Sequence, residues 1–190
     1  MKNIIPRILM LMSGLLLVSL FFFPMWNITL YAPQYPGGVA MYIWINKISG
    51  DTPATLQNIN ILNHYVGMKY IVPESIPELK YFPYIIYGMI ALAVLFSIIN
   101  IRPLYLFWGL LMIALAVAGL YDFYLWEYDY GHNLDPKAPI KIPEASFQPP
   151  LIGKKHIVNF IATSYPALSG YLAGLSIPVA FAAWWFKGKK

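Results

Sequence analysis

The chain has 190 residues, of which 59% are hydrophobic and 11% are charged, and its mean hydropathy is +0.58. An average water-soluble domain is much more polar, so this composition excludes an ordinary soluble globule. The net charge of +5 comes without a basic stripe between aromatic residues, which argues against nucleic-acid binding. Because the chain has no cysteine, it has no disulfide, no thiolate-bound cluster and no cysteine nucleophile.

Four segments are apolar enough to cross the hydrocarbon layer as helices. They cover about residues 8–23, 84–99, 104–124 and 157–186. The first follows Lys2 and Arg7, as a signal peptide would, but it ends in three phenylalanines and Pro24 without a small-x-small cleavage motif. We therefore interpret it as an uncleaved anchor. Only residues 100–103 separate the second and third spans, which predicts a tight antiparallel hairpin.

This pattern predicts an all-α membrane protein: a single membrane domain, residues 1–190, folded as a four-transmembrane-helix bundle with a small mixed extracytoplasmic cap. Two insertions, about residues 26–83 and 125–155, would form the cap. In the first, residues 39–45 predict a strand or a buried apolar segment, and residues 51–53 predict the start of a helix that stops at Gly67. The second is rich in proline, which favours an extended strap packed on the first.

The distribution of charge predicts an orientation for the spans. If the amino terminus is cytoplasmic, all eight acidic residues and seven lysines fall on the outer side, including Glu144 in the second insertion. All charged residues of the inner side are then basic: Lys2, Arg7, Arg102, Lys187, Lys189 and Lys190. Basic residues accumulate on the cytoplasmic side of membrane proteins, so we expect both termini inside and both insertions outside.

All three histidines of the chain are expected on the outer side: His64 and His132 in the two insertions, and His156 at the mouth of the fourth span. His64 and Met68 are four residues apart, so on a helix an imidazole nitrogen and a thioether sulfur would face the same ion. Histidine and methionine without cysteine suit copper, especially Cu(I), better than zinc or magnesium. A helix that ends at Gly67 would break this spacing, and the alternative is a histidine satisfied by hydrogen bonds in the cap.

His132 lies in residues 126–135, where carboxylates, phenols and an amide follow the third span. This run suits a metal ligand with an acceptor that orients it, and it equally suits an interfacial aromatic belt before a polar turn. His156 follows two lysines, so an anion, a lipid headgroup or a quinone headgroup fits it at least as well as a metal. The predicted copper ligands are His64, Met68 and His132, and no other cofactor is expected.

Signs of catalysis are scarce in the sequence. It contains no nucleophile elbow, no phosphate-binding glycine loop and no His-Glu-x-x-His motif. No ionisable residue lies well inside a predicted span, which argues against an ion-coupled transporter. One catalytic hypothesis remains, in which His132 acts with Asp129 or Asp135 as general acid and base. We expect that the protein is not an enzyme.

Four runs resemble small multi-span membrane proteins associated with bacterial nitrous oxide reductase systems: INKISGD (45–51), NINILNHYVGM (58–68), YDYGHN (128–133) and QPPLIG (148–153). The resemblance implies an accessory role to a periplasmic copper enzyme of denitrification, in copper-centre assembly or in membrane anchoring. It also implies a multi-pass protein of the bacterial inner membrane with periplasmic loops. Its partners would be lipids and other membrane or periplasmic respiratory proteins, with nitrous oxide reductase as the leading one. The alternative is a small structural subunit of another respiratory complex, without a metal or catalytic role.

Overall fold

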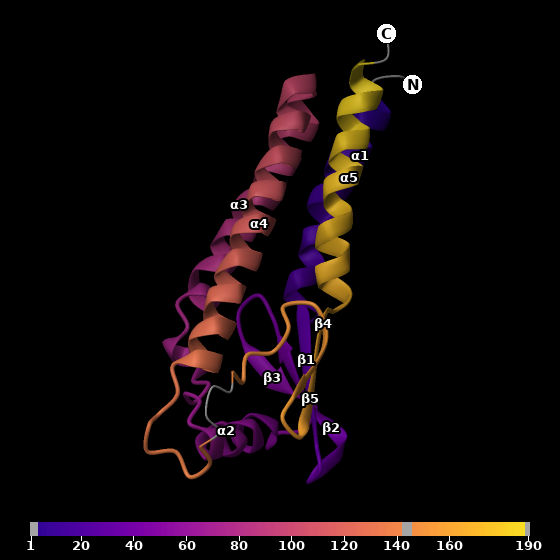
Figure 1. Ribbon diagram of the computed structural model, residues 1–190. Helices are drawn as coiled ribbons and strands as arrows, with labels where there is room; N and C mark the ends of the chain where they lie inside the picture. Colours follow the sequence, from indigo (N-terminus) through magenta and orange to yellow (C-terminus); the bar gives the residue numbers. More distant parts are fainter. Residues whose placement is uncertain (1–3, 142–145, 189–190) are drawn as a thin grey trace.

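The computed structural model describes residues 4–141 and 146–188, so Lys2, Lys189, Lys190 and Glu144 of the orientation argument lie outside the described residues. Within the described ranges, four helices are long and apolar enough to cross a membrane. They are α1 (Ile4–Val18, extended by the short helix η1, Ser19–Phe21), α3 (Glu78–Ile99), α4 (Arg102–His132) and α5 (Leu168–Gly188). The helices lie side by side, and both chain termini are found at the same end of them (Figure 1).

The predicted all-α fold is wrong, because the protein is mixed α/β and contains a five-stranded antiparallel sheet of order β3-β2-β1-β5-β4. The strands are β1 (Trp26–Ala32), β2 (Tyr35–Ile43), β3 (Ile48–Gly50), β4 (Gly153–Ile157) and β5 (Phe160–Pro166). Residues 157–166 are apolar enough to extend the predicted fourth span, but they form the end of β4, the turn and strand β5, and α5 begins only at Leu168. Besides β4, β5 pairs with β1, where Thr29 lies opposite Thr163. No local sequence pattern reveals a pairing over that distance.

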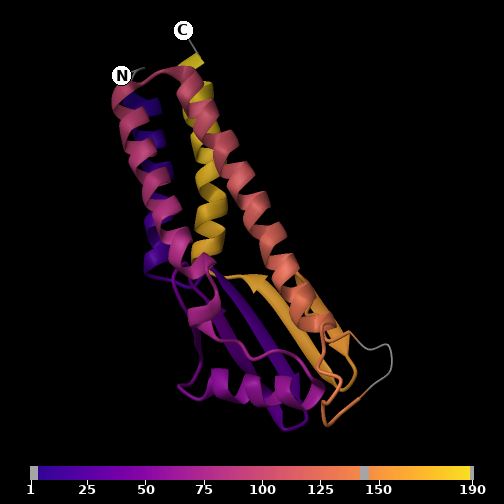
Figure 2. The same ribbon diagram turned by 90° about the vertical axis from the view of Figure 1, so that its left-hand side faces the viewer.

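The sheet forms most of a cap at the end of the helices opposite to the termini (Figure 2). We use the name cap for the five strands, α2 (Thr55–Val66), the short helix η2 (Pro73–Ser75) and the described connecting segments around them. One face of the sheet is covered by α2 and by the end of α4. The buried core between them consists of Trp26, Ile28, Val39, Met41, Ile59 and Ile71. The strand predicted at residues 39–45 is confirmed for residues 39–43, which belong to β2.

Helix α4 is longer than a membrane crossing requires. Its 31 residues rise about 46 Å, whereas the hydrocarbon layer is roughly 30 Å thick. The additional length is used in the cap, because Trp126 and Tyr130 pack against the buried core of the sheet. The apolar part, about residues 104–122, is therefore the candidate membrane crossing, and residues 123–132 belong to the cap.

Polar groups within the helical part are satisfied by internal hydrogen bonds. The indole of fully buried Trp108 donates to the carbonyl of Met89 at 2.9 Å, and the hydroxyl of Tyr105 donates to Asn100 at 2.9 Å. Asn100 ends α3 in the left-handed conformation, with φ of 57°, so that α4 can begin at Arg102. The predicted tight hairpin between the second and third spans is confirmed.

Candidate functional site

A cleft of about 370 Å³ lies in the cap between the end of α2 and the loop that follows α4. Ligand sites of small molecules begin at about 300 Å³, so the volume suits a small ligand or a protruding side chain of a partner. Two segments that are distant in the sequence form its walls. The lining residues are His64, Gly67, Met68, Lys69, Tyr70, Asn133, Leu134, Asp135, Lys137 and Ala138.

Gly67 builds one wall of this cleft. It has a left-handed φ of 83° and ends α2, and its amide bonds to the carbonyls of Asn63 and His64. Its own carbonyl accepts a 2.8 Å hydrogen bond from the amide of Asp135. A Cβ at this position would come within 2.9 Å of the Cβ of Ala138, so the close approach of the loop also requires glycine. The predicted helix stop at Gly67 is confirmed.

The start of α2 differs from the prediction. The helix begins at Thr55 rather than within residues 51–53, and its N-cap residue is Ala54. The hydroxyl of Thr55 donates to the carboxylate of Asp51 and accepts from the amide of Thr52 at 3.0 Å. The bond from Thr55 holds the pKa of Asp51 below its ordinary value. Asp51 therefore stabilises the turn before α2 by accepting a hydrogen bond from the Thr55 side chain, and it does not cap the backbone amides of the helix.

His64 and Met68 both line the cleft, as the predicted copper pair requires. They do not share a helical face, because α2 ends at Val66 and Met68 follows the left-handed Gly67. The amide of Met68 is held by the carbonyl of Asn63 at 2.9 Å. The ring of His64 stacks on Tyr70, with an interplanar angle of 9° and centroids 6.1 Å apart. His64 and Met68 thus line one cleft from the two sides of the residue that ends α2.

His132 does not line the cleft. Its ring stacks on Tyr128 with centroids 4.0 Å apart, and its Nδ1 lies 3.0 Å from the carbonyl oxygen of Tyr128. With Nδ1 engaged there, Nε2 is the nitrogen left to bind a ligand. The three predicted copper ligands are therefore not brought together, and only His64 and Met68 share the cleft. Within residues 4–141 and 146–188, no three His, Asp or Glu residues converge as a metal site.

The carboxylates beside His132 have other partners. Asp129 forms a 2.6 Å ion pair with Lys69, and its carboxylate accepts a hydrogen bond from the side-chain amide of Asn133. The bond from Lys69 holds the pKa of Asp129 below its ordinary value, with Asn133 acting in the same direction. Asp135 accepts the backbone amide of Lys137 at 2.8 Å. Asp129 and Asp135, the two carboxylates of the general acid–base hypothesis, are therefore both engaged in structural contacts.

His156 lies away from the cleft on the edge strand β4. Along this strand, Lys155 and Ile157 are part-buried or buried, whereas Lys154 and His156 are exposed. Successive side chains of a strand point to opposite faces, so His156 belongs to the uncovered face of the sheet. It joins neither of the other histidines.

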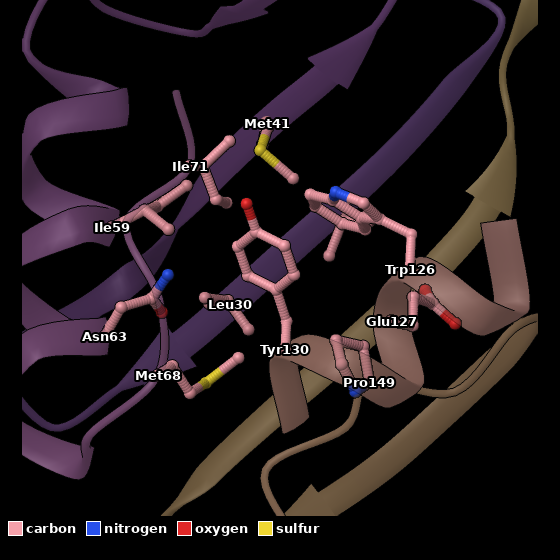
Figure 3. Close-up of a pocket in the computed structure, with 11 residues that line it drawn as sticks. Leu30, Met41, Ile59, Asn63, Met68, Ile71, Trp126, Glu127, Tyr130 and Pro149 are labelled. Carbon is pink, nitrogen blue, oxygen red and sulfur yellow. The ribbon is translucent and has the colours of Figure 1, made fainter. Parts of the chain in front are cut away.

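A second, smaller cavity of about 40 Å³ lies beneath the cleft, between α4 and the covered face of the sheet. Most of its lining is apolar, and Met68 lines both cavities. Figure 3 shows the ring of Tyr130 between the sulfur atoms of Met41 and Met68. The two thioethers therefore do not face a common point.

Glu127 lines this inner cavity and is fully buried, and neither of its carboxylate oxygens has a hydrogen-bond partner among the described residues. Burial raises its pKa to about 8, and the positive charge of Lys155 acts in the opposite direction. Sequence reasoning missed Glu127. Spacing alone gives no signal for its burial, because only the structure shows that Phe123 and Gly131, one helical turn away on either side, face the cap.

No protein-family model matches the chain, and no curated protein is found that resembles it significantly. The function is therefore argued from the cleft and its surroundings.

Proposed function

We propose that this protein is a membrane-embedded accessory protein of a periplasmic copper respiratory enzyme of the nitrous oxide reductase type. It would help to assemble the copper centres or hold the enzyme at the membrane. The resemblance of four sequence runs supports this proposal, and the observation that carries it is the cleft lined by His64 and Met68. In this proposal the cap is periplasmic, and both termini are on the cytoplasmic side of the bacterial inner membrane.

The donor set of the cleft suits transient copper binding. Imidazole and thioether groups are ligands for Cu(I), and two of them leave coordination positions for groups of an acceptor protein. The strongest soft ligand, a thiolate, is not available because the chain has no cysteine. A site of this kind would bind copper and release it by ligand exchange, which is what delivery to an enzyme requires.

Copper binding is tested by titrating the full chain in detergent with Cu(I) against a coloured chelator. We expect about one copper ion per chain, and an affinity at least tenfold lower in His64→Ala and in Met68→Leu. His156→Ala is the matched control, since His156 lies on the other face of the sheet, and should bind as the wild type does. His132→Ala shows whether this histidine is a third ligand in solution. Equal binding by wild type and a His64→Ala/Met68→Leu double variant would remove the copper role.

A second candidate function, a structural subunit of a respiratory complex, is favoured by the uncovered face of the sheet. Thr29 and Thr163 lie opposite each other on this face, with the exposed rings of Tyr31 and Tyr165 beside them. Tyrosine is enriched in protein interfaces. Under this alternative, Tyr165→Arg abolishes a complex that survives mild detergent extraction, while copper binding in the cleft is unchanged. A solitary monomer after such extraction would count against it.

A further inference from the structure

Residues 146–151, which we call the strap, cross the cap near the end of α4 and are held by three polar contacts. The amide of Phe147 donates to the carbonyl of Gly131 in α4 at 3.0 Å. The ammonium group of Lys155 in β4 donates to the carbonyl of Gln148 at 3.0 Å, and the hydroxyl of Ser164 in β5 donates to the carbonyl of Leu151 at 3.0 Å. One contact thus comes from each element beneath the strap.

The strap also packs closely against this part of the cap. Phe147 is buried in a small core with Ile157 and Ala162, and Pro149 lines the inner cavity. Gly131 allows the closest approach, because a Cβ there would overlap the backbone of Gln148. The strap therefore closes one side of the cavity that Glu127 lines.

Glu127 shares this cavity with few charged or titratable groups. The lining residues of β1, β2, α2 and residues 68–71 are apolar or neutral amides, and the strap contains no titratable side chain. From α4, Tyr130 lines the cavity, and Met68 lies on the opposite side of its ring from Glu127 (Figure 3). From β4, Lys155 is the cation that acts on Glu127. Lys155 is also the residue that holds Gln148.

We propose that Glu127 and Lys155 form a proton-dependent switch that controls whether the strap stays closed over the inner cavity. When Glu127 is protonated, it carries no charge that attracts Lys155, and the ammonium group of Lys155 stays hydrogen-bonded to the carbonyl of Gln148. When Glu127 releases its proton to water, a buried carboxylate without a hydrogen-bond partner draws the ammonium group or water toward itself. Gln148 then loses a partner, the strap loosens, and the inner cavity opens.

This switch does not require copper, although Met68 lines both the outer cleft and the inner cavity. Its three components, Glu127, Lys155 and Gln148, are not among the residues that line the outer cleft. An acidic surrounding keeps the strap closed, and an alkaline one opens it. The switch would therefore set the accessibility of the inner cavity whether or not His64 and Met68 hold a metal.

The test uses the natural absence of cysteine, which makes one introduced thiol a unique probe. Gln148→Cys places the thiol on the part-buried strap, and its maleimide labelling rate is measured in the full chain in detergent between pH 6 and pH 9. Each rate is divided by the rate of the same probe in a Glu127→Gln background, which removes the intrinsic pH dependence of thiol reactivity. We expect a ratio near one at pH 6 that rises severalfold by pH 9. A ratio that stays constant over this range would overturn the proposal.

A pair of lysine variants tests the role of Lys155. Lys155→Met removes the ammonium group that holds Gln148, so the strap should be loose at every pH and the pH-dependent rise of the labelling ratio should disappear. Lys154→Met is the matched control, because Lys154 is the preceding residue on β4 and is exposed on the opposite face, and it should leave the rise unchanged. A labelling ratio that still rises with pH in Lys155→Met as it does in the wild type, or equal effects of the two variants, would contradict the switch. Retention of the Glu127→Gln thermal transition shows that the reference chain is folded.

Discussion

The indole Nε1 of Trp26 donates a buried 2.7 Å hydrogen bond to the hydroxyl of Ser164. The two residues are 138 positions apart, and they join the first strand of the cap to its last long strand. Ser164 in turn donates to the carbonyl of Leu151, the last residue of the strap. β1 follows the first helix, α1, and β5 precedes the last helix, α5. This hydrogen bond therefore links the two strands through which these helices join the cap.

Trp26→Phe should lower the free energy of unfolding by about 1–2 kcal/mol, because it leaves the acceptor site of a fully buried hydroxyl unpaired. The measurement is the melting temperature of the full chain in detergent. Trp44→Phe is the matched control, since Trp44 donates to Ser49 at 2.9 Å in a part-buried position where water replaces the lost donor. A smaller loss in Trp26→Phe than in Trp44→Phe would refute the importance of this bond.

Gly131→Ala should destabilise the cap by about 1–3 kcal/mol, because the new methyl group overlaps the backbone of Gln148 and displaces the strap. Gly119→Ala is a control in the same helix. A Cβ at Gly119 meets no atom within 4 Å, and alanine favours helix over glycine by up to about 1 kcal/mol. The melting temperature should therefore fall in Gly131→Ala, and it should rise or stay unchanged in Gly119→Ala. Equal shifts would show that the strap does not rest on Gly131.

Val158→Gly should stabilise the protein. Val158 turns the β4–β5 hairpin with a left-handed φ of 55°, and its side chain is 59% exposed, so little packing is lost on its removal. The left-handed conformation costs about 1–2 kcal/mol for a residue with a Cβ, and part of this gain is offset by the greater freedom of glycine in the unfolded chain. We expect a net gain of about 0.5–1 kcal/mol in a thermal melt. Val158→Ala keeps the Cβ and should gain less; a fall in melting temperature for Val158→Gly would contradict the strain.

Stability should fall as the pH rises from about 5 to 8. The pKa of Glu127 is raised by burial from 4.5 to about 8, so the folded protein holds this proton more tightly than the unfolded chain does. Its contribution is complete below pH 4.5 and is lost as the pH approaches 8, at no more than roughly 1.4 kcal/mol per pH unit. Glu127→Gln should flatten this slope of melting temperature against pH, and Glu74→Gln, at an exposed position, should leave it intact. The idea fails if the Glu127→Gln slope equals that of the wild type.

The helical part of the fold was predictable, because a membrane-crossing helix needs a long apolar run and the chain shows four. The sheet was not predictable, since β5 continues an apolar stretch into α5 and its partner Trp26 lies near the other end of the chain. In the site, the spacing of His64 and Met68 predicted a shared helical face, whereas α2 ends before Met68 and the two residues line one cleft only because the chain turns at Gly67. The stacking of His132 on Tyr128 and the burial of Glu127 under the strap depend on tertiary contacts that spacing does not encode.

The accessory role is tested most directly on the respiratory enzyme itself, by measuring its copper content and its membrane-bound fraction in cells with and without this protein. We predict that nitrous oxide reductase from cells lacking the protein contains less copper or is less firmly attached to the membrane. The wild-type chain should restore the copper content, and the His64→Ala/Met68→Leu double variant should not. A reductase with unchanged copper content and unchanged membrane attachment in the absence of this protein would contradict the proposed function.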